Sequence, residues 1–215
     1  YDSRILAGKF LAMDSPVDAD LVIGVPESGN CAAMGYSMQS GIPYGMGFVK
    51  NAYVGRTFIK PKQKSRESSV QVKLNPIREA VEGKRVIMID DSIVRGTTSD
   101  RIVKMLREAG AKEVHIRPAC PPLVYGCKFL NFSRSSSELD LITRRIIQER
   151  EGANPSDEVL QNYADPDSQN YAEMVEEIRK RLNFTSLRFH RLDDLVESIG
   201  LPKCKLCTYC WDGRE

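Results

Sequence analysis

Two adjacent carboxylates stand near the middle of the sequence, and a loop of small residues follows them. Asp90 and Asp91 come directly after the apolar run 86–89, and residues 92–98 read Ser-Ile-Val-Arg-Gly-Thr-Thr. A carboxylate pair is suited to a divalent cation or to the hydroxyl groups of a sugar. A loop that opens a helix offers backbone N–H groups and a positive dipole end to an anion. These residue types in this order predict a site for a phosphorylated sugar.

A second short polar loop follows another apolar run earlier in the chain. Residues 20–25 read Asp-Leu-Val-Ile-Gly-Val, and residues 26–30 read Pro-Glu-Ser-Gly-Asn. The backbone N–H groups of this loop could also face an anion. Such a pattern alone is more often a plain turn, so its weight comes from its position upstream of the acidic pair.

Three cysteines crowd into the end of the chain. Cys204, Cys207 and Cys210 form two overlapping Cys-x-x-Cys pairs, and Cys127 lies upstream. This spacing lets two thiolates bind one zinc ion or one edge of an iron–sulfur cluster. A redox-active pair and incidental tail cysteines are the alternatives. The spacing is too tight for an ordinary disulfide framework, so we expect a reducing, cytoplasmic environment.

The elements that position these residues follow from the apolar pattern. The apolar runs within 20–25 and over 86–89 predict strands that are buried on both faces, as in a parallel sheet, and 113–118 is predicted to be the next strand. Helices are predicted over 1–12, 31–40, 99–109, 171–182 and 192–199, and a polar turn followed by an amphipathic helix over 133–150. Further strands are predicted over 43–50, 70–74 and 186–189, a short helix or turn over 75–81, and an exposed irregular excursion over 151–168. The expected fold class is α/β, with a central, mostly parallel sheet flanked by helices. Ligands bind beyond the carboxyl ends of the strands in such sheets, so the two polar loops should share one edge.

The composition is that of an ordinary globular protein. The 215 residues are 41% hydrophobic and 28% charged, and the formal net charge is +2. Charge alone therefore makes no case for nucleic acid or for a membrane surface, and no apolar run approaches the length of a membrane span. We expect a core over residues 1–132 and a helical extension with a cysteine-rich tail over 133–215. The first residue is Tyr rather than Met, so we expect a piece of a longer chain.

The stretch around the acidic pair resembles the thirteen-residue signature of type I phosphoribosyltransferases. The resemblance implies that family's fold, and it implies that Asp90 and Asp91 bind the ribose hydroxyls of phosphoribosyl pyrophosphate (PRPP) directly or through Mg²⁺. The loop 92–98 would hold the 5′-phosphate. Residues 25–29 are similar to the family's pyrophosphate-binding loop, which implies that Ser28 joins the two aspartates at Mg²⁺. The implied PRPP-binding residues are Glu27, Ser28, Gly29, Asp90, Asp91, Ser92, Ile93, Val94, Arg95, Gly96, Thr97 and Thr98.

Residues 50–67 form a polar, basic segment that is usually a solvated loop, but here it suits a lid that closes over a polyanion. Residues 50–61 closely resemble the flexible loop of the glutamine PRPP amidotransferase branch of the family. The resemblance implies that the segment closes over PRPP and contributes to an ammonia path. Lys50 and Arg56 are the candidates for phosphate contacts in catalysis.

The tail resembles the same branch. A Cys-x-x-Cys pair followed by an aromatic residue, one residue and Gly maps onto Cys207, Cys210, Trp211 and Gly213. In that branch this pattern accompanies a [4Fe–4S] cluster, and a cysteine after a Pro-Pro turn is a further ligand, which maps onto Cys127. The residues after Cys127 depart from the usual pattern. The branch's remaining ligand would precede this chain, and Cys204 is a candidate substitute.

The resemblance implies transfer of the phosphoribosyl group of PRPP to ammonia, giving 5-phosphoribosylamine and pyrophosphate, the first step of purine biosynthesis. It implies a missing N-terminal glutaminase domain that supplies the ammonia, and a dimeric or tetrameric homo-oligomer. A nucleobase salvage phosphoribosyltransferase, a non-enzymatic PRPP-binding regulator and an iron–sulfur or zinc interaction module are the alternatives. The basic segment and the tail argue against the first, the lack of a DNA-binding motif against the second, and the acidic signature against the third.

Overall fold

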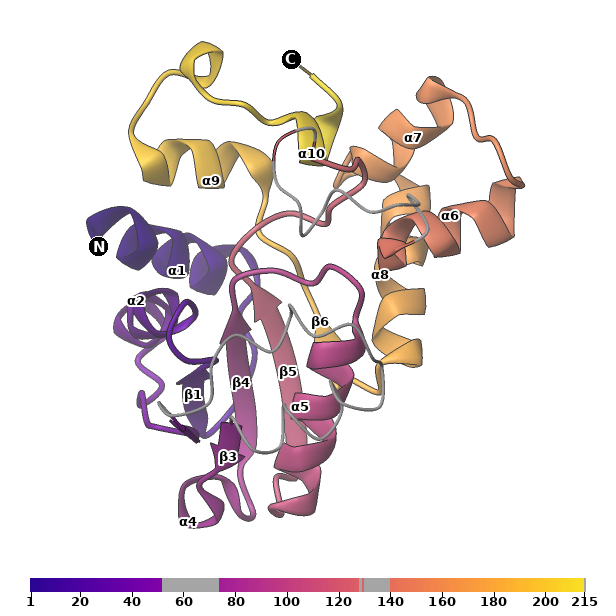
Figure 1. Ribbon diagram of the computed structural model, residues 1–215. Coiled ribbons are helices and arrows are strands. Elements are labelled where there is room, and N and C mark those ends of the chain that lie inside the picture. The colour runs from indigo at the N-terminus through magenta and orange to yellow at the C-terminus, as the bar shows by residue number, and fades with distance from the viewer. Residues whose placement is uncertain (52–73, 128, 130–139, 215) are drawn as a thin grey trace.

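The structure is a computed structural model that describes residues 1–51, 74–127, 129 and 140–214 (Figure 1). Its helices are α1 (Asp2–Asp14), α2 (Asn30–Ser40), α4 (Arg78–Val81), α5 (Thr97–Glu108), α6 (Ile142–Glu151), α7 (Asp157–Ala164), α8 (Gln169–Arg181), α9 (Leu192–Ile199), the 3₁₀ turn η3 (Lys203–Lys205) and α10 (Tyr209–Asp212). Its strands are β1 (Leu21–Gly24), β2 (Phe48–Lys50), β3 (Leu74–Pro76), β4 (Arg85–Asp90), β5 (Glu113–Pro118) and β6 (Ser186–Leu187). The expected α/β class is confirmed.

Four strands form one parallel sheet in the order β1-β4-β5-β6. The strand that ends in the acidic pair, β4, is central: it pairs with β1 over 86–89 and with β5 along its whole length. The last strand, β6, comes from the C-terminal part of the chain and pairs with β5. The carboxyl ends of β1 and β4 therefore lie side by side, as the order of loops and strands predicts.

Both faces of the sheet are covered by helices, which explains why β1 and residues 86–89 of β4 show no polar alternation. On one face, Val22, Ile87 and Ile89 pack against buried residues of α1 and α2 such as Leu11 and Tyr36. The opposite face belongs to a larger core that also takes in α5, α6, α7 and α8, and its members include Ile23, Val86, Met88, Ile102, Ile146, Tyr163 and Ile178. Figure 1 shows α1 and α2 on one side of the strands and α5 and α8 on the other.

The prediction of a strand over 43–50 is only partly right. Strand β2 starts at Phe48 and pairs antiparallel with β3 in a separate two-stranded sheet. Upstream of it, Tyr44 forms a single parallel bridge with Val22 of the main sheet. The glycines at 45 and 47 let this segment lie close to β1, because a Cβ at either position would lie within 3 Å of the Leu21 or the Ile23 side chain.

The prediction of an irregular excursion over 151–168 is wrong in its middle. Helix α7 occupies Asp157–Ala164, and Ser156 caps it by accepting a hydrogen bond from the Val159 N–H. Leu160 and Tyr163 are buried in the larger core. The many polar residues of this stretch hide a short amphipathic helix, because only one turn-and-a-half of apolar spacing marks its inner face.

Within the described ranges, no helix combines the length and the apolar character needed to span a bilayer.

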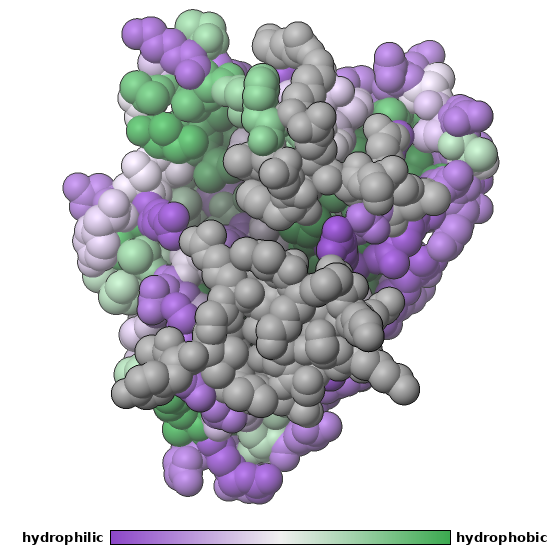
Figure 2. All heavy atoms as spheres, viewed as in Figure 1, coloured by the Kyte–Doolittle hydropathy of each residue, from purple (hydrophilic) through white to green (hydrophobic). Residues whose placement is uncertain are grey.

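Figure 2 shows apolar side chains gathered over α9, where Ile199 at its end and Leu201 after it are exposed. This helix is amphipathic, yet Ser198 is its one buried residue.

Candidate functional site

The acidic pair ends the central strand, and its two carboxylates differ in environment. Asp90 is 7% exposed, and its Oδ1 accepts a hydrogen bond from the Asp91 N–H at 2.8 Å. Asp91 is exposed and accepts from the Ser92 hydroxyl at 3.2 Å. Burial and then the negative charge of Asp91 raise the pKa of Asp90 to about 7. A buried carboxylate beside a second carboxylate is an arrangement that a bound cation would relieve.

This pair fits a divalent cation in its chemistry, because carboxylate oxygens are the ligands that Mg²⁺ takes in proteins. Among the described residues, no cationic side chain contributes to the pKa of Asp90. The residues that the structure describes hold no group of three or more His, Cys, Asp and Glu arranged for a metal ion. A magnesium site here would therefore rest on two carboxylates, the Ser28 loop and oxygen atoms of a substrate.

The loop after the acidic pair leads into the N-terminus of α5. Gly96 precedes this helix with a φ of 81°, in the left-handed region, and a Cβ there would lie 2.8 Å from the Ile142 Cδ1 atom. No side chain caps the helix, so its first N–H groups stay available to a ligand. The N-terminus of a 12-residue helix with a glycine turn before it is a suitable binding place for a phosphate group.

Helix α6 holds this loop in place, a contact that the sequence did not indicate. The Ile142 N–H donates to the Val94 carbonyl at 2.9 Å, and the Arg145 guanidinium donates to the Arg95 carbonyl at 2.7 Å. Arg95 in turn pairs with Asp140 at 3.0 Å. The C-terminal part of the chain therefore shapes the loop predicted to bind the 5′-phosphate.

The second polar loop lies against the end of β4. The Val25 N–H donates to the Ile89 carbonyl at 2.8 Å, and a Cβ on Gly29 would lie 2.3 Å from that carbonyl oxygen. Only glycine permits this approach. The structure therefore brings Glu27, Ser28 and Gly29 to the same edge as Asp90, and the Pro26–Glu27 peptide bond within this loop is cis.

Two basic residues contact this second loop. Lys50, the last residue of β2, pairs with Glu27 at 3.0 Å. Arg4 of α1 donates to the Ser28 carbonyl at 3.1 Å, a contact for which the sequence offered no signal. The start of the predicted lid thus adjoins the predicted pyrophosphate loop. Arg56 and the other basic residues of the segment 52–67 lie outside the described residues.

The cysteine tail folds back onto the segment that follows β5. The Val124 and Tyr125 N–H groups donate to the Cys210 carbonyl at 3.0 and 3.1 Å. Burial, and then the neighbouring Cys127 and Cys207, raise the pKa of Cys210 to about 11. These three predicted cluster ligands therefore lie close enough to interact, although they do not form a metal-binding group among the described residues. Cys204 lies exposed on η3.

A residue that sequence reasoning missed lies between the acidic pair and the tail. Cys120 is buried, and burial, then the charges of Asp91, Cys210 and Asp90, raise the pKa of its thiol. The thiol therefore stays protonated and acts as an apolar filler. Next to it, the Ala119 N–H donates to the Asp90 carbonyl at 2.8 Å, so one continuous segment connects the end of β4 to the tail.

Comparison with known proteins shows the family of this chain and its fold. A family model described as a phosphoribosyl transferase domain matches residues 11–120. The chain is 43% identical over 215 residues to an amidophosphoribosyltransferase of Mycobacterium bovis, which covers all of this chain and 36% of the relative. It thus spans about a third of the length of the curated relatives it matches.

Two solved structures share the fold. One is described as the structure of the allosteric regulatory enzyme of purine biosynthesis, with a TM-score of 0.75 and 41% identity over 99% of this chain and 40% of that chain. The other is a glutamine PRPP amidotransferase from B. subtilis complexed with ADP and GMP, with a TM-score of 0.74 and 42% identity over 99% of this chain and 41% of that chain. Both likenesses extend beyond the family model into the C-terminal helices and the tail.

Proposed function

Because this chain belongs to the phosphoribosyltransferase family, we propose that it binds PRPP with Mg²⁺ at the carboxyl edge of its sheet and transfers the phosphoribosyl group to ammonia. The products would be 5-phosphoribosylamine and pyrophosphate, the first step of purine biosynthesis. The observation that carries this proposal is the meeting of three anion- or cation-binding parts at one edge: the acidic pair, the Gly29 loop against Ile89, and the open N-terminus of α5.

Each part has a distinct task in this proposal. The N–H groups at the start of α5 bind the 5′-phosphate, and Gly96 provides the turn that exposes them. Asp90 and Asp91 accept the ribose hydroxyls or hold Mg²⁺ together with Ser28. The loop at Gly29 faces the pyrophosphate, and the ion pair between Glu27 and Lys50 ties that loop to the start of the basic segment.

The chemistry needs no covalent nucleophile from the chain. Ammonia bonds to C1 of the ribose, the bond from C1 to the pyrophosphate oxygen breaks, and the ammonium product loses a proton. Negative charge grows on the leaving pyrophosphate, so fixed N–H groups and cations placed around it lower the barrier. Mg²⁺ would supply neutralisation of that charge when bound. Exclusion of water from the ribose by the segment with Lys50 and Arg56 belongs to the same proposal.

Two further parts extend the proposal to the longer protein. The length of the relatives supports a glutaminase portion that would deliver ammonia to this site, so the chain alone would use free ammonia. The interaction of Cys210 with Cys127 and Cys207 supports a [4Fe–4S] cluster that ties the tail to the core without entering the reaction. We also propose a homo-oligomer and a cytoplasmic location, the latter in keeping with six described cysteines that form no disulfide.

The test is PRPP binding by the purified chain, measured by calorimetry with and without Mg²⁺, followed by pyrophosphate release with ammonium. We expect Mg²⁺-dependent binding that the double change Asp90→Asn plus Asp91→Asn weakens by about 100-fold or more, since it removes both charged ligands. The matched control is Asp193→Asn plus Asp194→Asn on α9, which should bind as the unchanged chain does. Equal binding by both double variants would refute the assignment.

The same assay separates the alternatives. Binding without release of pyrophosphate in the presence of ammonium would favour a PRPP-binding regulator. Turnover with a purine or pyrimidine base, but not with ammonium, would favour a salvage enzyme. For the cluster, anaerobic reconstitution with iron and sulfide should develop visible absorbance that Cys207→Ser plus Cys210→Ser abolishes.

A further inference from the structure

A polar cleft lies away from the acidic pair. Its volume is about 470 Å³, and its walls come from the end of α1, β5, α8 and the segment around β6. None of the residues that line it is among the PRPP candidates. This size is within the range of small-molecule sites rather than that of a single water molecule.

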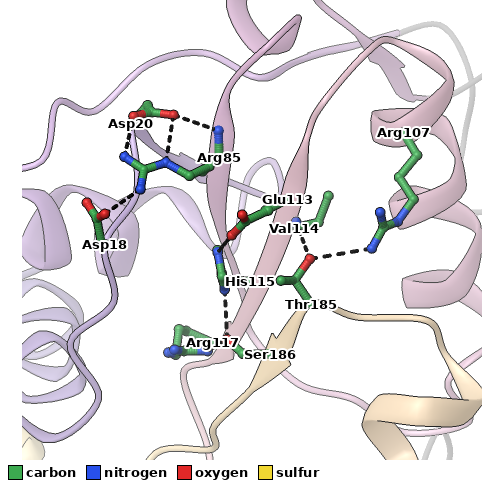
Figure 3. Close-up of polar contacts among 10 residues, drawn as sticks. All are labelled: Asp18, Asp20, Arg85, Arg107, Glu113, Val114, His115, Arg117, Thr185 and Ser186. Atoms are coloured by element: carbon green, nitrogen blue, oxygen red, sulfur yellow. Dashed lines mark hydrogen bonds and ion pairs between the residues drawn. The ribbon is translucent and has the colours of Figure 1, made fainter.

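A buried cation lines this cleft. Arg117 of β5 is 2% exposed, and its guanidinium donates to the Ser15 carbonyl at 3.3 Å, the Ile116 carbonyl at 2.9 Å and the Ser186 hydroxyl at 3.0 Å. Figure 3 shows Arg117 beside Ser186. Among the described residues, no carboxylate lies within ion-pair distance of Arg117, and burial lowers its pKa. Buried arginines are normally paired with an anion, whereas the described groups that favour the charged form of Arg117 are the Tyr36 hydroxyl and Asp14, and neither forms an ion pair with it.

Two more guanidinium groups line the same cleft. Arg188 follows β6, is exposed, and donates to the Leu187 carbonyl at 3.3 Å. Arg179 of α8 forms two hydrogen bonds of 2.8 Å with Glu176, so this pair is already neutral. The remaining acidic group is Asp14 at the end of α1. The positive charges of Arg117 and Arg188 exceed the negative charge of Asp14 by one, so the lining of the cleft has a net charge of +1.

We propose that this cleft binds the phosphate group of a small molecule, held between Arg117 and Arg188. Two guanidinium groups that approach from β5 and from the segment after β6 suit the tetrahedral oxygens of phosphate better than the two coplanar oxygens of a carboxylate. Arg117 is fixed by its hydrogen bonds to two carbonyls and a hydroxyl, so its orientation is set before a ligand arrives. This cleft is separate from the proposed PRPP site, so either can be right without the other.

The test follows the Arg117 Nε–H signal by NMR in the full chain while inorganic phosphate is added at constant ionic strength. That signal is assigned with the Arg117→Lys variant. We expect a saturable shift, and we expect Arg188→Gln to weaken the phosphate affinity about tenfold, since one charge-assisted contact is lost. Lys180→Gln on α8 removes the same charge without lining the cleft and is the matched control. PRPP binding in each variant is measured separately and should not change.

Several results would overturn the proposal. They are an Arg117 signal that does not move, a shift of the same size with chloride, an equal affinity for acetate, or an unchanged phosphate affinity in Arg188→Gln. Ribose 5-phosphate distinguishes the two sources of the phosphate group. Tighter binding than that of inorganic phosphate means that the rest of the cleft takes the organic part of a phosphate ester, and equal binding means that the free ion is the ligand.

Discussion

The two ends of the central strand β4 carry opposite charge and are built in opposite ways. At the amino end, the Arg85 guanidinium donates to Asp20 Oδ1 at 2.7 Å and also pairs with Asp18, and the Arg85 N–H donates to Asp20 Oδ2 at 2.8 Å (Figure 3). These hydrogen bonds lower the pKa of Asp20 to about 2. Charge at this end is matched by charge from the chain itself.

At the carboxyl end of β4, two negative side chains lie next to each other. Asp90 is buried, and burial, then the like charge of Asp91, raise its pKa to about 7. At its amino end β4 thus has an arginine that is paired with carboxylates of the chain. At its carboxyl end it has two adjacent carboxylates whose repulsion a bound cation would reduce. The difference is what is expected when one edge of a sheet serves stability and the other serves binding. Substitutions that remove the charge at the two ends should therefore change the free energy of unfolding in opposite directions.

The largest effect is expected from Asp90→Asn in metal-free protein with a chelator. The pKa of Asp90 is raised from 3.8 to about 7 on folding. Stability from this group is therefore present below pH 3.8 and is lost as the pH rises through about 7. Asn carries no charge, so the variant should be more stable than the unchanged chain at neutral and higher pH, by roughly 2–4 kcal/mol.

Urea unfolding across this pH range measures the difference between the two proteins. The advantage of the variant should disappear in acid, where Asp90 of the unchanged chain is protonated. Asp91→Asn is the partner experiment, and it should also stabilise the fold, because it removes the like charge that raises the pKa of Asp90. A variant that is less stable than the unchanged chain at high pH would show that the carboxyl end is not strained by charge.

The second effect concerns the glycine turn before α5. Gly96→Ala places a Cβ at positive φ and 2.8 Å from the Ile142 Cδ1 atom, so it should cost about 1–3 kcal/mol of unfolding free energy and weaken PRPP binding. Gly41→Ala is a matched control, because Gly41 has a φ of 75° and a Cβ added there would meet nothing within 4 Å. The two variants share the backbone strain and differ in the crowding and in their distance from the site.

Thermal unfolding and calorimetry with PRPP separate the two contributions. Gly41→Ala should lose only the backbone part of the stability and should bind PRPP as before. Should both variants bind PRPP equally well, the N-terminus of α5 would not be the place where the 5′-phosphate is held.

The third effect is at the amino side of β5. His115 accepts a hydrogen bond at Nδ1 from Ser186, because the Ser186 hydroxyl already accepts from Arg117, and its Nε2–H donates to Glu113 at 2.9 Å. The neutral ring satisfies both contacts. Burial lowers the pKa of His115, and likewise that of His190, below 6.5.

Stability from these histidines is present above pH 6.5 and is lost as the pH falls below it, since folding opposes their protonation. We expect His115→Gln to flatten this acid loss by up to about 1.4 kcal/mol for each pH unit between 6.5 and the lower pKa of the folded state, and to change nothing further below that pKa. The measurement is urea unfolding of both proteins from neutral to mildly acidic pH. A parallel pH dependence of the two proteins would mean that His115 is not the titrating group.

Some of the difference between the two ends of β4 could be predicted from the sequence. The central strand, the acidic pair and the glycine turn are contiguous, so a short window contains the whole βα unit from Arg85 to Glu108. The charge match at the amino end could not be predicted, because Asp20 is 65 residues from Arg85 and only the parallel pairing of β1 with β4 brings them together.

The same limit applies to the cleft and to the tail. Arg117 and Ser186 lie on strands separated by 69 residues, and neither position carries a local motif. Helix α7 was missed because its few apolar residues are interrupted by polar ones, and its burial depends on helices that pack onto it from elsewhere in the chain. Contacts made by residues distant in sequence decide these features, whereas local spacing decided the elements that were predicted correctly.

The smallest effect is expected at the amino end of β4. Arg85→Met removes the partner of Asp18 and Asp20, which are solvent-accessible, so a small loss of stability is expected at neutral pH. The pKa of Asp20 is lowered from 3.8 to about 2, so this contribution is present above 3.8 and is lost as the pH falls through about 2. Urea unfolding in neutral and in acidic buffer should show the difference between the two proteins shrinking in acid. Lys104→Met, which breaks a single pair with Asp100, is the control and should cost less, because Arg85 makes several hydrogen bonds to two carboxylates. PRPP binding should be unchanged in Arg85→Met; a large loss of binding would mean that the two ends of the strand are coupled rather than divided between stability and binding.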